Sequence, residues 1–382
     1  MSVKLIRTST VPGSIDTFYK DFLRELREEE NYEIVVVSSP GKEMQTIEER
    51  EGVRCIEVPM QRHISPIKDL KSLWRMTKLL RREKPNMVHS ITPKAGLITM
   101  MAARFAGVPV RLHTFTGLIF PTAKGLKKQI LMLTDKLTCA CATHIIPEGE
   151  GVKSDLQTHK ITKKPLEVLG NGNIRGIDLD YYNPKIPEIA EEAEKLRDLD
   201  RFTFVFIGRI VSDKGINELV KAFEMLKQEV PNVRLLLVGR SEEKLDPLEP
   251  ETIKTIKYDK DIEAVGQQKD VRPWLLAADA LVFPSYREGF PNVVIEAGAM
   301  GLPSIVTDIN GSREIIEEGK NGLIVPPHNF DDLCKAMKEL VLNNEKRNYM
   351  ASNSREIIAS RYEQGYVRSC QKDYYRKILK KK

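Results

Sequence analysis

The sequence has few cysteines, few aromatic residues and no long apolar run. Its 382 residues include five cysteines and two tryptophans, and aromatic residues make up 7%. No stretch reaches the roughly 18 uncharged apolar residues that cross a bilayer, and the first apolar run contains Lys4 and Arg7. Five scattered cysteines favour reduced thiols over a disulfide framework. We therefore expect a cytosolic protein rather than a secreted or integral membrane protein.

Several signatures of catalysis and metal binding are also missing. The chain has no GxSxG, HExxH, CxxC or Walker segment, which excludes hydrolases of those kinds. Cys139 and Cys141 form a CxC pair, but no second Cys or His pair lies at ligand spacing. The segments Asp178-Leu-Asp180 and Asp198-Leu-Asp200 match a DxD metal motif, yet neither follows a predicted buried strand. We therefore predict no metal site.

Short β-branched runs alternate with amphipathic stretches, which predicts an α/β protein with parallel sheets. A first set of six strands is predicted at Val3–Thr8, Tyr32–Ser38, Val53–Val58, Met87–Ser90, Val110–Thr114 and His144–Ile146. A second set is predicted at Phe202–Ile207, Val233–Val238, Ile262–Val265, Ala280–Phe283, Ser304–Val306 and Gly322–Val325. This restart, together with the length, predicts two doubly wound domains with ligands at the carboxyl ends of the strands, in a cleft between the domains.

A segment rich in glycine, asparagine and proline separates the two sets. Gly170, Gly172 and Gly176 have the spacing GxGxxxG, which differs from a dinucleotide loop and favours a linker. We predict a first domain over residues 1–170, a linker region over 171–200 and a second domain over 201–360. Residues 361–382 are predicted to form a C-terminal helix that returns to the first domain.

The segment SYREGFPNVVIEA follows the strand that ends at Phe283. Pro291 suits the first turn of a helix that continues to about Met300, and such a helix start offers backbone N–H groups to a phosphate or a sugar hydroxyl. Glu288 before this helix and Glu296 within it are able to accept hydrogen bonds from separate hydroxyls of one elongated ligand. The alternative is a pair of ordinary surface glutamates.

A second polar segment, GRIVSDKG, follows the strand that ends at Ile207. Lys214 lies where a helix is predicted to begin, and a cation there opposes the helix dipole unless an anion is bound. Gly208 ends the strand, and Arg209 and Lys214 together could hold a diphosphate. The alternative is a solvated pair of charges on a surface loop.

Three further strand ends supply candidate positions. A planar base is expected near Val265 and Gly266, where glycine lets a ring approach the backbone, although a simple turn is nearly as good an interpretation. Gly13 follows the first strand and could let the backbone approach phosphate or acceptor, or could mark a plain turn. His113 ends the Val110–Thr114 strand, where the switch-point rule places ligands.

The E-x7-E spacing in SYREGFPNVVIEA, followed by GLPSIVTD and GSRE, closely resembles the retaining glycosyltransferases of family 4. That resemblance implies the GT-B fold of two Rossmann-like domains. It also implies that Glu288 contacts the donor sugar and Glu296 the ribose, and that Arg209 and Lys214 neutralise the departing diphosphate. The family places a histidine close to the transferred sugar, often as HG; here Thr116 precedes the glycine and His113 lies three residues earlier, and we favour His113.

Positive charge is concentrated in the first half of the chain. Residues 54–136 contain 16 basic and 4 acidic side chains, although the whole chain carries only +6. Pro66–Lys84 is predicted to form a basic amphipathic helix, and Lys127 and Lys128 add a second basic spot. Such a helix favours an anionic membrane surface, with a packed helix and a solvated basic face as the alternative. Nucleic acid is not expected, since no recognition motif accompanies the charge.

We therefore predict a metal-independent retaining glycosyltransferase that moves a hexose or N-acetylhexosamine from a UDP-sugar to a polyprenyl-diphosphate-linked glycan. It needs no cofactor besides the donor and is expected in the cytoplasm, on the inner face of the cell membrane. The alternatives are an enzyme resembling UDP-GlcNAc 2-epimerase and a non-catalytic protein that binds nucleotide sugars. The predicted catalytic residues are His113, Arg209, Lys214 and Glu288. The predicted donor-binding residues are Gly13, Gly208, Arg209, Lys214, Val265, Gly266, Glu288, Gly289, Phe290, Pro291, Asn292 and Glu296.

Overall fold

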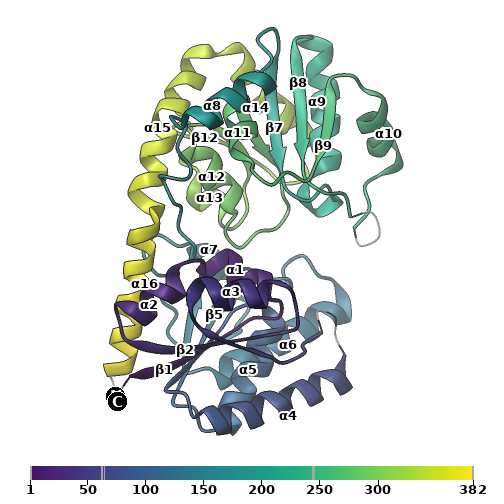
Figure 1. Cartoon of the computed structure of the whole chain (residues 1–382). Helices are drawn as coiled ribbons and strands as arrows, with labels where there is room; N and C mark the ends of the chain where they lie inside the picture. Colours follow the sequence, from purple (N-terminus) through teal and green to yellow (C-terminus); the bar gives the residue numbers. More distant parts are fainter. Residues whose placement is uncertain (1, 62, 64, 243–245, 381–382) are drawn as a thin grey trace. The chain divides into compact units, whose positions relative to one another are not determined.

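The chain forms two compact units, each built around one parallel sheet (Figure 1). The computed structural model describes residues 2–61, 63, 65–242 and 246–380. The first unit combines the N-terminal segment through Gly176 with the C-terminal segment from Gly365, and the second unit is Ile177–Gln364. Among the described residues, no helix combines the length and the apolar character required to cross a membrane.

The first unit has a six-stranded sheet in the order β3-β2-β1-β4-β5-β6, in which all neighbours run parallel. Its strands are β1 (Val3–Thr8), β2 (Tyr32–Ser38), β3 (Arg54–Glu57), β4 (Met87–Ser90), β5 (Val110–Phe115) and β6 (His144–Pro147). Its helices are α1 (Pro12–Tyr19), α2 (Phe22–Glu28), α3 (Glu43–Glu51), α4 (Pro66–Glu83), α5 (Pro93–Phe105), α6 (Gly125–Cys141), α7 (Glu150–Thr158) and α16 (Gln364–Lys380). The strand order reverses between β1 and β4, which makes this edge the switch point of the unit.

The second unit repeats the same strand order, as β12-β11-β10-β7-β8-β9. Its strands are β7 (Phe202–Ile207), β8 (Val233–Val238), β9 (Ile262–Gly266), β10 (Ala280–Phe283), β11 (Ser304–Thr307) and β12 (Gly322–Val325). Its helical segments are α8 (Pro187–Leu196), η1 (Ser212–Lys214), α9 (Ile216–Glu229), α10 (Pro250–Tyr258), α11 (Arg272–Ala277), α12 (Asn292–Ala299), α13 (Ser312–Ile315), α14 (Phe330–Leu342) and α15 (Asn344–Tyr362). The predicted α/β fold of two doubly wound sheets is confirmed.

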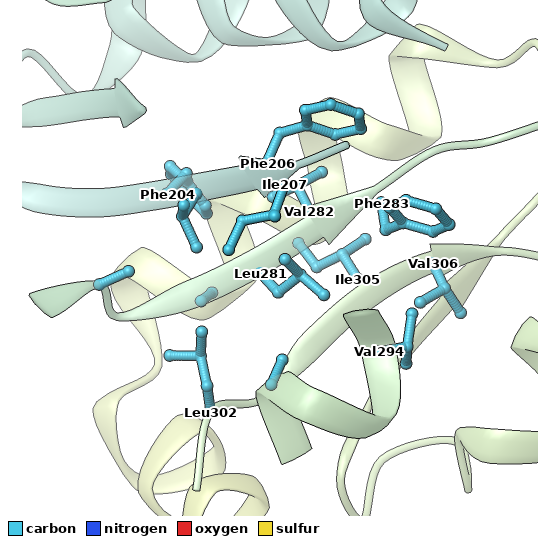
Figure 2. Close-up of a cluster of buried hydrophobic side chains, with 14 of the residues drawn as sticks. Phe204, Phe206, Ile207, Leu281, Val282, Phe283, Val294, Leu302, Ile305 and Val306 are labelled. Atoms are coloured by element: carbon cyan, nitrogen blue, oxygen red, sulfur yellow. The ribbon is translucent and has the colours of Figure 1, made fainter. Parts of the chain in front are cut away.

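Continuous apolar runs explain why these strands are central. Phe204 and Phe206 of β7, Leu281 of β10 and Ile305 of β11 are all fully buried. Figure 2 shows their side chains in one cluster that also receives Val294 from α12. A strand that is covered by helices on both faces buries successive side chains, so its sequence shows an unbroken apolar run rather than an alternating pattern. The ends of β7 and β10, between which the strand order reverses, are therefore supported by a fully buried apolar core.

The segment 171–200, which we expected to be a linker, is divided between the two units. Residues 171–176 belong to the first unit and 177–200 to the second. Helix α8 packs against α11, and Ile177 forms a parallel bridge with Glu363. These contacts give the segment a fixed place in the second unit, because its apolar Ile189 and Ala193 are buried there.

Helix α16 belongs to the first unit although it lies at the other end of the sequence. Its Tyr375 hydroxyl accepts a hydrogen bond from Arg7 of β1 and lies 2.6 Å from His89 Nδ1 of β4. The other ring nitrogen of His89 lies 2.7 Å from the Thr114 hydroxyl. Burial, reinforced by the Arg7 charge, holds the pKa of His89 well below its usual value, so the ring is neutral. The neutral ring of His89 donates a hydrogen bond through one nitrogen and accepts one through the other, so both of its nitrogens have partners in the core of the first unit.

Candidate functional site

The second unit brings Lys214 and Glu288 together at its switch point. Strands β7 and β10 are parallel neighbours, so the loops at their carboxyl ends lie side by side. Lys214 Nζ forms an ion pair with Glu288 Oε1, and only 15% and 17% of the two side chains are exposed. Lys214 ends η1, and Gly215 with a φ of 72° turns the chain into α9. A cation at a helix start is unfavourable, because the helix dipole is positive there. The Glu288 carboxylate offsets this cost by pairing with Lys214.

Buried groups from the ends of β10 and β11 hold this ion pair in place. The Ser285 hydroxyl, which is fully buried, donates to Glu288 Oε1 at 2.9 Å. The Thr307 hydroxyl at the end of β11 donates in turn to the carbonyl of Ser285. The ring of Phe283 lies under Lys214, with its centroid 5.4 Å from Nζ. The pair is therefore preorganised, which is what a site that stabilises a developing charge requires.

Arg209 lies on the same edge of the sheet but is paired with a different carboxylate. Its Nη1 donates to Glu242 Oε2 at 3.0 Å, and Arg240 binds the other oxygen of Glu242 at 2.6 Å. The hydrogen bond from Arg209 lowers the pKa of Glu242 below its ordinary value. Arg209 is 43% exposed, so its guanidinium is open to an anion from solvent. Lys214 and Arg209 thus sit in two separate ion pairs rather than one joint cluster.

Gly239, Arg240 and Glu242 also lie at this edge of the sheet and were not predicted from the sequence. The strand β8 ends in Val-Gly-Arg just as β7 ends in Ile-Gly-Arg, and this repeated Gly-Arg pair was the available signal. A Cβ atom on Gly239 would lie 1.7 Å from the carbonyl oxygen of Gly208, so only glycine fits there. The two backbones touch at adjacent strand ends, which places Arg209 and Arg240 on either side of one carboxylate.

Helix α12 begins next to Glu288, without a side-chain cap. Its N-cap is Pro291, and Gly289, Phe290 and Pro291 are buried, whereas Asn292 is partly exposed. A Cβ atom on Gly311 would lie 2.4 Å from the Gly289 carbonyl oxygen, so α13 packs closely on this loop. The backbone N–H groups at a helix N-terminus of this kind donate hydrogen bonds to anions or to hydroxyl oxygens.

Glu296 lies one turn further along α12 and is 8% exposed, on the buried side of the helix. The structure therefore places the two glutamates of the E-x7-E pattern in different surroundings. Glu288 lies in the loop with a cation beside it, and Glu296 lies within the helix.

At the end of β9 there is open space beside Gly266, whereas the carbonyl of Val265 already has a hydrogen-bond partner. Gly266 has a φ of 73°, and a Cβ atom there would meet nothing within 4 Å. The register shifts between Leu237 and Val238, so that Val265 is left out of the pairing with β8. The Val265 carbonyl accepts a hydrogen bond of 2.8 Å from the Gln268 side chain. A flat group could approach Gly266, and Gln268 lies beside that approach.

In the first unit, Gly13 is the second residue of α1. A Cβ atom there would lie 3.9 Å from Glu43 Oε1, an ordinary contact, so packing does not demand glycine at this position. The helix begins with Pro12, and Val11 at its N-cap gives no side-chain hydrogen bond.

His113 is inside the first unit rather than on its surface. The ring is 1% exposed, its Nδ1 lies 2.8 Å from the Ser90 hydroxyl, and a Cβ atom on Gly96 would lie 2.4 Å from Cε1. Burial lowers the pKa of His113 to about 3, so the ring is neutral at physiological pH. Thr116, just beyond the strand, is partly exposed. Exposure therefore favours Thr116 over His113 as the side chain that a ligand could reach.

The two DxD segments are local turns. Asp178 Oδ1 accepts the backbone N–H groups of Asp180 and Tyr181, and Asp198 Oδ1 accepts that of Asp200 at 3.0 Å. Across the described ranges, no three His, Cys, Asp or Glu side chains are grouped in a way that could hold a metal ion.

Comparisons of sequence place the chain among the glycosyltransferases. Residues 188–357 match the family of glycosyl transferases group 1, and residues 15–172 match the glycosyl transferase 4-like domain. The capsular polysaccharide biosynthesis glycosyltransferase CapM of Staphylococcus aureus is 32% identical over 361 residues, which are 94% of this chain and 93% of CapM. A UDP-Gal:alpha-D-GlcNAc-diphosphoundecaprenol alpha-1,3-galactosyltransferase of Escherichia coli is 29% identical, over 81% of this chain and 80% of its own.

Solved structures agree on the fold. HepE of Anabaena, crystallised with UDP-glucose, superposes with a TM-score of 0.80 at 18% identity, and 97% of this chain and 99% of HepE are covered. Sucrose-phosphate synthase of Thermosynechococcus elongatus superposes with a TM-score of 0.82 at 20% identity over all of both chains. The chain belongs to the GT-B glycosyltransferases that join a 4-like domain to a group 1 domain, the family that its E-x7-E and GRIVSDKG segments resemble.

Proposed function

We propose that this chain is a retaining glycosyltransferase that moves a sugar from a UDP-sugar to a polyprenyl-diphosphate-linked glycan. The observation that carries the proposal is the partly buried Lys214–Glu288 ion pair at the switch point of the second unit. A diphosphate would take the place of the glutamate beside Lys214, and the freed carboxylate would accept a hydrogen bond from a hydroxyl of the donor sugar.

The chemistry that this arrangement supports is electrostatic. The bond between the anomeric carbon and the diphosphate oxygen breaks, and the acceptor oxygen bonds to that carbon on the same face. The acceptor proton passes to the departing diphosphate. Lys214 and Arg209 stabilise the charge that grows on the diphosphate, and the start of α12 orients the sugar. Within this scheme the ribose lies near Glu296 and the base near Val265 and Gly266, and no metal or further cofactor is needed.

The names of relatives support the choice of donor and acceptor. The Escherichia coli relative uses UDP-galactose and acts on a diphosphoundecaprenol-linked sugar. A relative in Campylobacter jejuni, 25% identical over 93% of this chain and 96% of its own, acts on a diphospho-undecaprenol-linked sugar as an N-acetylgalactosaminyltransferase. We infer the same donor and acceptor classes here, and we assign the acceptor to the first unit, near Gly13 and Thr116, since His113 is buried and Thr116 is partly exposed.

A thermal-shift panel with UDP, GDP, ADP and their sugars tests the donor assignment. UDP should stabilise the protein, and Lys214→Ala should weaken UDP binding at least tenfold in calorimetry, since a charged hydrogen bond contributes about 1.5–3 kcal/mol. Lys227→Ala is a matched control, because Lys227 is also paired with carboxylates, Asp259 and Asp261, but in the last turn of α9, away from its N-terminus. The proposal fails if no nucleoside diphosphate or nucleotide sugar stabilises the chain.

Activity assays of the wild type and of one variant distinguish the transferase from the two alternative functions. An epimerase would convert UDP-GlcNAc with no acceptor present, whereas a transferase would not. A non-catalytic binding protein would hold the donor without transfer, so a Glu288→Gln variant that keeps UDP binding and loses transfer would support catalysis.

We further propose that the first unit docks on an anionic membrane on its cytoplasmic side. The side chains of Ile67, Leu70 and Trp74 on the first half of α4 are 86%, 67% and 63% exposed. Basic residues that include Lys71 and Arg75 are interleaved with them and are exposed as well. Apolar exposure of this kind favours a membrane over the alternative of a packed helix with a solvated basic face.

Helix α6 carries a second exposed apolar row beside basic residues. Leu126 and Leu133 are 71% and 57% exposed, and next to Leu126 the side chain of Lys127 is exposed and that of Lys128 is partly exposed. Helices α4 and α6 both pack on α5, so the two rows belong to one layer of the first unit.

Binding to anionic liposomes tests this surface. Reversal of Lys71 and Arg75 to glutamate should weaken binding at least tenfold, because each cation contributes about 1 kcal/mol near anionic lipid. Reversal of Lys254 and Lys335, which are 67% and 76% exposed in the second unit, is the matched control. Equal binding by both double variants and the wild type would overturn the membrane proposal.

A further inference from the structure

Two ion pairs, rather than one, connect the loops that follow β7 and β10. Asp213 and Lys214 are neighbours in the first loop, and Arg287 and Glu288 are neighbours in the second. Arg287 Nη2 donates to Asp213 Oδ2 at 2.9 Å beside the Lys214–Glu288 pair. Each loop therefore presents one charge of each sign to the other.

The backbones of the loops are in contact without help from these charges. The Tyr286 N–H group donates to the Asp213 carbonyl at 3.0 Å. A Cβ atom on Gly215 would lie 2.1 Å from the carbonyl oxygen of Pro284. Since main-chain contacts already join the loops, the Arg287 side chain is not required to hold them together, and its charge needs another explanation.

The Asp213 carboxylate depends on Arg287 for compensation. Its Oδ1 atom is buried and has no hydrogen-bond partner among the residues that the structure describes. The other oxygen, Oδ2, accepts from Arg287. Both side chains are about one-third exposed, with values of 31% for Asp213 and 33% for Arg287. Without Arg287, the residue directly before Lys214 in the loop would be a carboxylate with one buried oxygen and no hydrogen-bond donor among the described residues.

We propose that Arg287 is a positioning residue that neutralises Asp213 and so keeps Lys214 available to the diphosphate of the donor. An unpaired Asp213 would repel that diphosphate and would compete with it for Lys214, because like charges oppose and opposite charges attract most strongly where water is partly excluded. This inference rests on the proposed function, in which the site binds a nucleoside diphosphate.

Titration of the full-length protein with UDP in a calorimeter tests the proposal. Arg287→Met should weaken UDP binding about tenfold, and Asp213→Asn should leave it within about twofold of the wild type. The double variant should regain the wild-type affinity within about threefold, because the charge that Arg287 neutralises is then gone. A purely structural pair would instead give weak binding in both single variants and no recovery in the double variant.

Two further variants keep the result interpretable. Arg287→Lys retains the positive charge and should bind UDP nearly as the wild type does. Arg201→Met removes an arginine that is paired with Asp198 at the opposite end of β7, with 28% and 21% exposure, and should not change UDP binding. If the wild type binds UDP and the double variant does not recover, the pair has no such role. If the wild type binds no UDP, the proposed function itself falls, and this inference with it.

Discussion

The Tyr375 hydroxyl should be one of the most important polar groups for the stability of the first unit. It accepts a hydrogen bond from Arg7, which is fully buried, and it is hydrogen-bonded to His89, which is 1% exposed. Two other nitrogens of Arg7, Nε and Nη1, have no hydrogen-bond partner within the described residues. Tyr375→Phe would remove the hydroxyl and keep the ring.

The structure gives the size of the effect. Loss of the hydroxyl leaves Arg7 Nη2 and one nitrogen of His89 without a partner in a buried place. A buried hydrogen bond to a charged group contributes about 1.5–3 kcal/mol and one between neutral groups about 1 kcal/mol. The ring still packs on His89, whose centroid lies 5.7 Å away. We therefore expect the variant to lose about 3 kcal/mol in the free energy of unfolding of the first unit.

The neighbouring Tyr374→Phe is the matched control. Tyr374 is also on α16 and only 6% exposed, but its hydroxyl makes no hydrogen bond with a residue that the structure describes. Urea denaturation followed by circular dichroism should show a change within about 0.5 kcal/mol for this variant. Equal destabilisation by the two substitutions would refute the reasoning, because it would mean that the contacts of the Tyr375 hydroxyl contribute nothing specific.

Three other predictions follow from single groups. Burial raises the pKa of Asp135 to about 7, and a raised pKa stabilises the fold at low pH and loses that effect as pH rises. The wild type should therefore gain about 2 kcal/mol over Asp135→Asn between pH 7 and pH 5 in urea denaturation, whereas a constant difference would contradict the raised pKa. Gly239→Ala should cost about 3 kcal/mol, because its Cβ atom would meet a backbone oxygen at 1.7 Å; Gly301→Ala, also at positive φ but with open space, should cost about 1 kcal/mol in the same assay. Glu242→Gln should tighten UDP binding two- to threefold in calorimetry by releasing Arg209, and weaker binding would show that Glu242 instead holds Arg209 in its working position.

The positions of the strands could be predicted because burial on both faces leaves a strong mark on the sequence. Each of the twelve predicted strands is a strand in the structure, within one residue at each end, so the residue after its end lies at the carboxyl edge of a sheet. That logic predicts that the loops of Lys214 and Glu288 lie at one edge of the sheet, and the family resemblance selected these two residues within the loops. It also led to Val265 and Gly266 at the end of β9, where the register shift and the Gln268 contact then had to come from the structure.

The partners of charged side chains could not be predicted in the same way. Arg287 and Asp213 are 74 residues apart and each has an opposite charge beside it, so the sequence does not say which pairs form. Arg209 is predicted to share an anion with Lys214, and the sequence does not show that in the structure it is paired with Glu242, 33 residues away. The burial of His113 depends on Gly96 of α5, whose missing side chain makes room for the ring. Such contacts are set by how helices cover the sheet, and local patterns do not encode them.

Because α16 belongs to the first unit, it also determines the order in which the two units complete their folding during synthesis. Once a ribosome has made residue 176, all six strands of the first unit exist, but Tyr375 is still 199 residues away and Arg7 has no hydroxyl to bind. The second unit, continuous from Ile177 to Gln364, emerges next and has all its own parts. The first unit therefore completes its fold after the second unit. Until α16 is synthesised, the Arg7 guanidinium lacks the Tyr375 hydroxyl that accepts its hydrogen bond.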